Sequence, residues 1–96
     1  MNQRPPRGCA AVGCMQLIAA HKFMCEDHAR IIPQSNRDEL MRTFEDWKAG
    51  RALRIRYVAA KIRAIVAVAG VENRACPHSL TEILSRLDRG EWSVDA

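Results

Sequence analysis

The chain has 96 residues, of which 48% are hydrophobic and 27% charged, and its net charge at pH 7 is +4. A chain of this length predicts one domain with a modest core that gains stability from a metal or another cross-link. Charged residues interrupt every long apolar run, and the first seven residues lack the apolar core of a secretory signal. We therefore expect no membrane association and a cytoplasmic location.

Two pairs of potential metal ligands follow a basic, proline-containing start. Residues 1–8 contain Pro5-Pro6 between two arginines, which predicts a flexible N-terminal arm. The next residues give a C-x4-C pair and, after a finger-length loop, a C-x2-H pair. Thiolate and imidazole pairs at such spacings are typical of closed, tetrahedral zinc sites that stabilise structure. We predict a zinc-binding module over residues 9–33, with Zn²⁺ held by Cys9, Cys14, Cys25 and His28.

Other ligand sets and other cysteine chemistry remain open at this point. His21, Cys76 or His78 could replace the fourth ligand, but C-x2-H lets Cys25 and His28 meet one metal across a single turn. The four cysteines also allow two disulfides, although a reducing cytoplasm favours a metal. Within the loop we expect a hairpin in which residues 15–18 pair with residues 22–24.

This pattern resembles small proteins of unknown function that are encoded by tailed phages and prophages. These often combine a C-x4-C pair, an aliphatic stretch and Phe-Met-Cys-x-x-His with a proline, an Arg-rich amphipathic helix that ends in Gly, and an Ala-rich helix. The resemblance covers roughly residues 8–70, and it departs in having Ala29 where an aromatic residue often follows the histidine, and in the added C-terminal segment. It implies a phage-type zinc module, located in the bacterial host cytoplasm if the chain is phage-encoded.

A helical region is predicted over residues 34–90. The first helix, about residues 37–49, has Asn36 and Glu39 at capping-box spacing, an apolar stripe that includes Trp47, and Gly50 at its end. The last, about residues 80–89, follows a second capping box at Ser79 and Glu82 and precedes a tail over residues 91–96.

The middle helix, about residues 52–69 and ended by Gly70, has two opposite apolar faces. We expect one face to pack on the first helix and the zinc module. The other, a stripe of mostly small residues, is expected to be covered by the last helix. This in-chain docking makes us prefer a monomer over a homodimer. The small-residue stripe comprises Leu53, Tyr57, Ala60, Ala64 and Val68.

We therefore expect a mainly α fold in which a small zinc-binding β-hairpin or knuckle packs on about three helices. No catalytic motif is present, so we expect a binding protein and not an enzyme. The basic side chains between the apolar faces predict nucleic-acid association through phosphates. The alternative is a protein–protein adaptor or inhibitor that acts on a host protein through exposed residues such as Met15, Met24 and Trp92. The predicted nucleic-acid contacts are Arg54, Arg56, Lys61 and Arg63.

Overall fold

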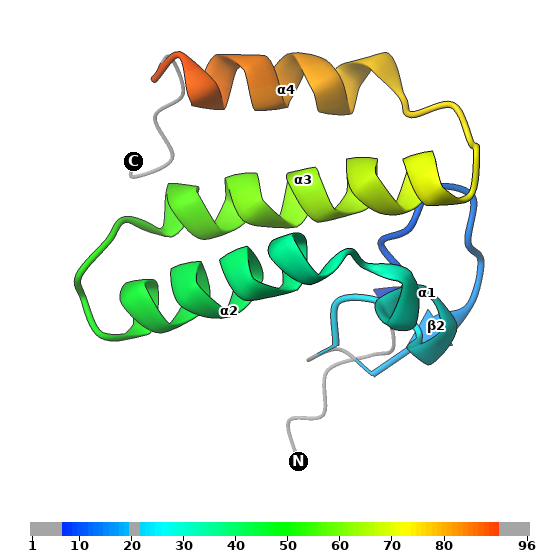
Figure 1. The fold of residues 1–96 in the computed structure, drawn as a ribbon, viewed down its shortest axis with the longest axis horizontal. Helices are drawn as coiled ribbons and strands as arrows, with labels where there is room; N and C mark the ends of the chain where they lie inside the picture. The colour runs from blue at the N-terminus through cyan, green and yellow to red at the C-terminus, as the bar shows by residue number, and fades with distance from the viewer. Residues whose placement is uncertain (1–6, 20–21, 91–96) are drawn as a thin grey trace.

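The computed structural model describes residues 7–19 and 22–90 and has the expected mainly helical fold with a small antiparallel pair of strands at its N-terminal end (Figure 1). His21 and the 91–96 tail, with Trp92, lie outside the described residues, as does most of the predicted arm. In the described part of the chain no helix combines the length and hydropathy of a membrane span. The elements are β1 (Arg7–Gly8), β2 (Leu17–Ile18), α1 (Glu26–Ile31), α2 (Gln34–Lys48), α3 (Arg54–Val71) and α4 (His78–Asp88).

The strand pairing differs from the expected hairpin. β2 pairs with β1, so that Arg7 lies opposite Ile18, and residues 7 and 8 belong to the sheet instead of a free arm. The reason is the turn inside the C-x4-C pair, which reverses the chain and returns residues 15–18 beside β1. The expected partner segment, residues 22–24, contacts this unit differently, because the carbonyl of Phe23 accepts a hydrogen bond of 3.2 Å from the N–H of Ala10.

Prolines, and not the predicted capping boxes, begin the two helices α2 and α4. Each helix starts earlier than expected, directly after an N-cap proline, Pro33 or Pro77, and neither cap has a side-chain hydrogen bond. The fixed φ of proline suits a helix start, and the proline carbonyl accepts the first backbone N–H groups. Both glutamates of the predicted boxes instead form ion pairs, Glu39 with Arg63 and Glu82 with Arg86.

The helix ends were predicted correctly for α2 and incorrectly for α3. Gly50 has a φ of 76° after α2, as a C′ glycine requires. Gly70 does not end α3, which continues through it to Val71. Asn73 instead takes the left-handed conformation, with a φ of 57°, and the N–H of Arg74 closes the turn on the carbonyl of Ala69 at 2.8 Å.

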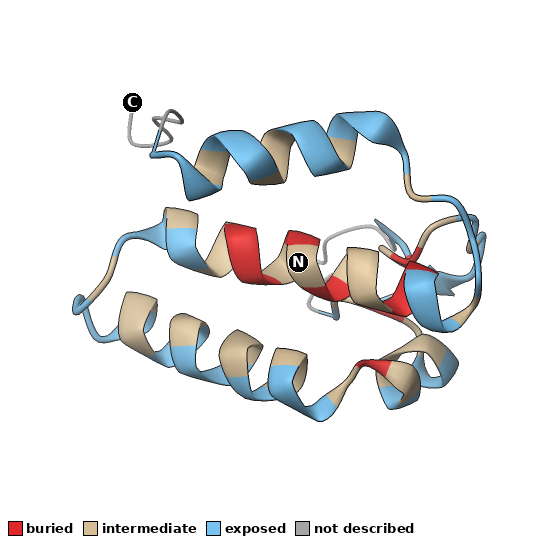
Figure 2. Cartoon of the chain, turned by 45° about the horizontal axis from the view of Figure 1, so that its top comes forward, coloured by how far each residue is buried: buried red, intermediate tan, exposed pale blue. Residues whose placement is uncertain are grey.

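Helix α3 lies between α2 and α4 (Figure 1). Strands β1 and β2 and helix α1, which we call the N-terminal module, lie at one end of the α2–α3 layer. Most of the buried positions are on α3 and in that module, as Figure 2 shows. The expected partners of the two apolar faces of α3 were assigned wrongly. Tyr57 of the small-residue stripe stacks on Trp47 of α2, and Ala64 and Val68 pack against the N-terminal module, not against α4.

Candidate metal centre

The first ligand pair is held by β1 and by a tight turn. β1 leads directly into Cys9, whose N–H donates a hydrogen bond of 2.9 Å to the carbonyl of Gln16. The chain then turns so that the N–H of Cys14 donates to the carbonyl of Ala11 at 3.2 Å. Gly13, with a φ of 78°, occupies the turn position that favours a residue without a side chain. The turn therefore brings Cys14 back beside Cys9.

The second ligand pair is held by the first turn of α1. Cys25 is the N-cap residue of this helix, and His28 follows three residues later, so both side chains lie on one side of the turn. The Sγ atom of Cys25 lies 3.1 Å from Nδ1 of His28, and the Sγ atom of Cys9 lies 3.7 Å from the same nitrogen.

The four predicted ligands converge on one point. A single ligand atom from each of Cys9, Cys14, Cys25 and His28 lies within 4.8 Å of the other three. In a tetrahedral zinc site the metal–sulfur and metal–nitrogen bonds place neighbouring ligand atoms roughly 3.3–3.8 Å apart. The cluster therefore has the composition and approximate dimensions of a site that could hold a metal ion.

A backbone donor supports a thiolate in this cluster. The N–H of Cys25 points at Sγ of Cys9, with a nitrogen–sulfur distance of 3.3 Å. Cys9 is itself buried, so a negative charge on its sulfur needs such a donor or a bound cation. All four cysteines are free thiols, and the disulfide alternative is not formed.

Glu72 and Arg74, which the sequence did not indicate, complete the polar surroundings. Both carboxylate oxygens of Glu72 lie 3.0 Å from Nε2 of His28, on the side of the ring opposite the cysteines. A carboxylate at this position holds the ring so that the other nitrogen, Nδ1, would face a metal ion bound by the cysteines. Arg74 forms an ion pair of 3.4 Å with Glu72, and its guanidinium lies over Gly13, where an added Cβ would approach it to 2.8 Å.

Arg37 of α2 supports α1, the short helix that carries His28. Its guanidinium donates hydrogen bonds to three carbonyls at the end of α1: those of Ile32 at 2.9 Å, Ala29 at 3.0 Å and Arg30. Terminal carbonyls of a helix lack partners within the helix, so these bonds satisfy groups that would otherwise need water. From the sequence alone, Arg37 appeared to be an ordinary residue of the polar face of α2.

An apolar core lies beneath the cluster and joins it to α3. Met24, which we expected to be exposed and available to a partner, is only 4% exposed and belongs to this core. Burial follows from its position between the strands and α1, where it meets the small side chains of α3. The buried members of the core are Cys9, Ala11, Met24, Ile32, Ala64 and Val68.

Neither of the other possible ligands in the described residues joins the cluster. Cys76 and His78 lie in the connection to α4 and at its start, and neither contributes a ligand atom. Cys76 is a half-buried free thiol and His78 is exposed.

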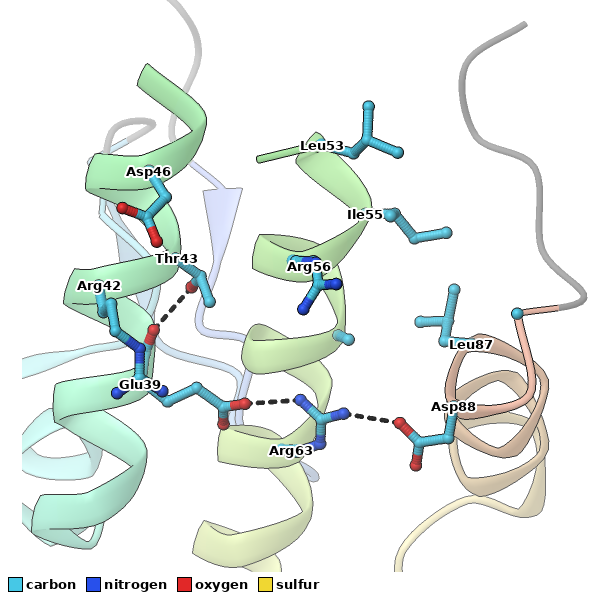
Figure 3. Close-up of a pocket in the computed structure, with 12 residues that line it drawn as sticks. Glu39, Arg42, Thr43, Asp46, Leu53, Ile55, Arg56, Arg63, Leu87 and Asp88 are labelled. Atoms are coloured by element: carbon cyan, nitrogen blue, oxygen red, sulfur yellow. Dashed lines mark hydrogen bonds and ion pairs between the residues drawn. The ribbon is translucent and has the colours of Figure 1, made fainter. Parts of the chain in front are cut away.

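The four residues predicted to contact nucleic acid lie on two sides of α3. The guanidinium of Arg54 is 5.8 Å from the ring centroid of Trp47, and the ammonium of Lys61 is 4.9 Å from that of Tyr57. Arg63 instead bridges Glu39 of α2 and Asp88 of α4, with both contacts at 2.6 Å (Figure 3). These two carboxylates offset the charge of Arg63 and connect three helices.

Arg56 lines a cleft of about 560 Å³ beside this ion-pair network (Figure 3). Helices α2, α3 and α4 all contribute to the cleft, whose apolar wall includes Ile55 and Leu87. Arg56 and Arg63 therefore face the cleft, whereas Arg54 and Lys61 lie with the aromatic rings of α2 and α3. The predicted set of four does not form one continuous surface.

No family model, no curated protein and no solved structure matches this chain.

Proposed function

We propose that the chain is a small zinc-binding regulatory or binding protein in which Zn²⁺ builds structure. The observation that carries this proposal is the convergence of Cys9, Cys14, Cys25 and His28 within 4.8 Å. Three sulfur donors and one imidazole nitrogen suit Zn²⁺ better than they suit Mg²⁺ or Ca²⁺, which prefer oxygen. Four protein ligands also fill a tetrahedral shell, so the site favours a structural role over an enzymatic one.

We further propose that the partner of this protein is nucleic acid. The net charge is +4, and Arg54 and Lys61 carry positive charges that no carboxylate within the described ranges offsets at ion-pair distance. Such cations are available to phosphates, and their contribution to binding would weaken steeply with salt. The phage-type assignment rests on the resemblance of residues 8–70 alone.

The second candidate is an adaptor or inhibitor that acts on a host protein. The observation in its favour is the cleft between α2, α3 and α4, beside which Leu53 is 61% exposed. A protein partner in this cleft would bury apolar surface, and its affinity would depend little on salt. A pull-down from bacterial lysate with and without nuclease would separate the candidates, because only a nucleic-acid partner is lost after nuclease treatment.

Metal analysis of the purified protein tests the zinc site. We expect about one zinc per chain in the wild type and a clear loss of zinc in Cys14→Ser after dialysis against a chelator, because three ligands hold the metal less tightly than four. Cys76→Ser is the matched control, since Cys76 lies outside the cluster. Full zinc retention in Cys14→Ser under conditions that leave the control loaded would contradict the ligand set.

A further inference from the structure

Two groups of cations among the described residues differ in what they contact, and others, such as Arg42 and Arg56 of the cleft, belong to neither group. Several arginines are held by carboxylates, namely Arg30, Arg51, Arg63, Arg74 and Arg86. Three other cations, Lys48, Arg54 and Lys61, lie over three aromatic rings of α2 and α3, and Arg7 of β1 is close enough to Lys61 to lower its pKa. No carboxylate in residues 7–19 and 22–90 lies within 4.0 Å of these four cations. We call this surface the aromatic-basic face; it consists of Arg7, Lys48, Arg54 and Lys61 with Phe44, Trp47 and Tyr57.

The rings form one packed unit. Trp47 and Tyr57 stack with their centroids 5.9 Å apart and an interplanar angle of 16°. Phe44 meets both of them edge-on, at 6.1 Å from Trp47 and 5.2 Å from Tyr57. This packing fixes the end of α2 against the first half of α3, so the side chains around the rings are carried by a rigid base.

Three of the four cations lie over these rings. The Nζ atom of Lys48 is 4.9 Å from the centroid of Trp47 and 5.6 Å from that of Phe44, while Arg54 lies over Trp47 and Lys61 over Tyr57. A ring quadrupole attracts a cation without neutralising it, unlike a carboxylate. These side chains are therefore held at the rings, and no carboxylate neutralises their charge within the described residues.

The cations also repel one another. Burial, and then the charges of Arg54 and Arg7, lower the pKa of Lys61. Arg7 comes from β1 and the other two from α3, so the sheet and the helix bring like charges together. Like charges collected without counter-charges raise the free energy of the unbound protein, and a bound polyanion would relieve that repulsion.

We propose that the aromatic-basic face binds the phosphate backbone of a nucleic acid, an inference that rests on the nucleic-acid association proposed above and assigns its surface. Each of the three rings packs against the other two and has a cation over it, so we expect the rings to position cations for phosphate contacts and not to stack on bases. Phosphate contacts carry no sequence information, and binding through this face is accordingly independent of sequence. Arg56 and Arg63, on the cleft side, do not belong to it.

A pair of charge-matched double variants tests this surface. Arg54→Gln/Lys61→Gln removes two cations from the aromatic-basic face. Arg42→Gln/Arg56→Gln removes two exposed cations that line the cleft. Binding of a fluorescein-labelled, mixed-sequence DNA duplex is followed by fluorescence anisotropy over a series of NaCl concentrations. Circular dichroism and zinc content verify that both variants are folded and loaded.

We expect the first variant to make the negative slope of log affinity against log salt shallower by roughly 2, since each lost phosphate contact reduces its magnitude by about one unit. Its affinity at low salt should fall by about tenfold or more, while the cleft variant changes the slope by less than about half a unit. Equal effects of the two variants, or a larger effect of the cleft variant, would overturn this assignment and leave nucleic-acid association intact. Absence of DNA binding by the wild type would overturn both.

Discussion

The carboxylate of Glu72 lies 3.0 Å from Nε2 of His28, although 44 residues separate them in the chain. Glu72 is the C-cap residue of α3, whereas His28 is on α1. The contact therefore joins the end of the central helix to the candidate metal site. It also leaves Nδ1 of His28 on the side of the sulfur atoms of Cys9 and Cys25, where it could bind a metal ion together with them.

Replacing Glu72 should weaken zinc binding without removing a ligand. We expect a loss of affinity of about tenfold for Glu72→Gln, whose amide oxygen still accepts a hydrogen bond, and up to about a hundredfold for Glu72→Ala. Competition with a chromophoric chelator measures the affinity. Glu82→Gln is the control, because it removes a carboxylate that pairs only with Arg86 on the surface of α4. Equal affinities for all these variants would show that Glu72 does not support the site.

Arg37→Met should destabilise the protein through α1. The substitution keeps much of the apolar stem of the side chain but removes the donors to three carbonyls at the end of α1. We expect a loss of about 1–3 kcal/mol in the free energy of unfolding, measured by denaturant titration, together with weaker zinc binding. Arg42→Met, on the exposed part of the same helix, is the control and should change stability by less than about 0.5 kcal/mol.

The ligand set was predictable because each pair depends on local geometry. A turn of four residues and one turn of a helix fix the neighbours of Cys14 and His28 almost independently of the rest of the fold. Glu72 and Arg37 were not predictable, since their roles depend on where α3 and α2 are placed. Spacing alone does not distinguish a carboxylate that faces a histidine from one that faces water.

The helices were predictable as elements, but not in their boundaries or partners. The two predicted capping boxes do not form. The carbonyls of Pro33 and Pro77 accept the first N–H groups of the helices, and the glutamate of each box pairs with an arginine. The apolar periodicity of α3 identified two faces correctly. Both faces are similarly apolar, however, so the pattern did not determine which of them α4 would cover.

Lys61→Met should be more stable than the wild type, and the difference in the free energy of unfolding should be largest at neutral pH. Burial and the charges of Arg54 and Arg7 lower the pKa of Lys61 in the folded state, so the folded protein binds fewer protons than the unfolded chain between the lowered pKa and the ordinary value of 10.5. The contribution of Lys61 to stability therefore becomes more favourable as pH rises through that window. Thermal unfolding of both proteins should show the advantage of Lys61→Met shrinking from about pH 7 to about pH 10. An advantage that grows with pH would contradict this sign.

Ala64→Leu tests the contact between α3 and the N-terminal module. Ala64 is 0% exposed and lies in one core with Cys9 and Met24, so a larger side chain has no space there. We expect a loss of about 1–3 kcal/mol in the free energy of unfolding and reduced zinc affinity, because the displaced core includes a ligand. Ala49→Leu, at the exposed end of α2, is the control for adding the same atoms.

The same variant separates packing within one chain from packing between chains. In the structure the stripe around Ala64 packs against the N-terminal module of its own chain, so the substitution should lower stability and leave the molecular mass in light scattering unchanged. If a second copy covered this stripe instead, the larger side chain would break the contact between copies and the mass would fall by half. If the variant keeps its mass, stability and zinc affinity, this face of α3 is not tightly packed, and the packing described for Ala64 is wrong.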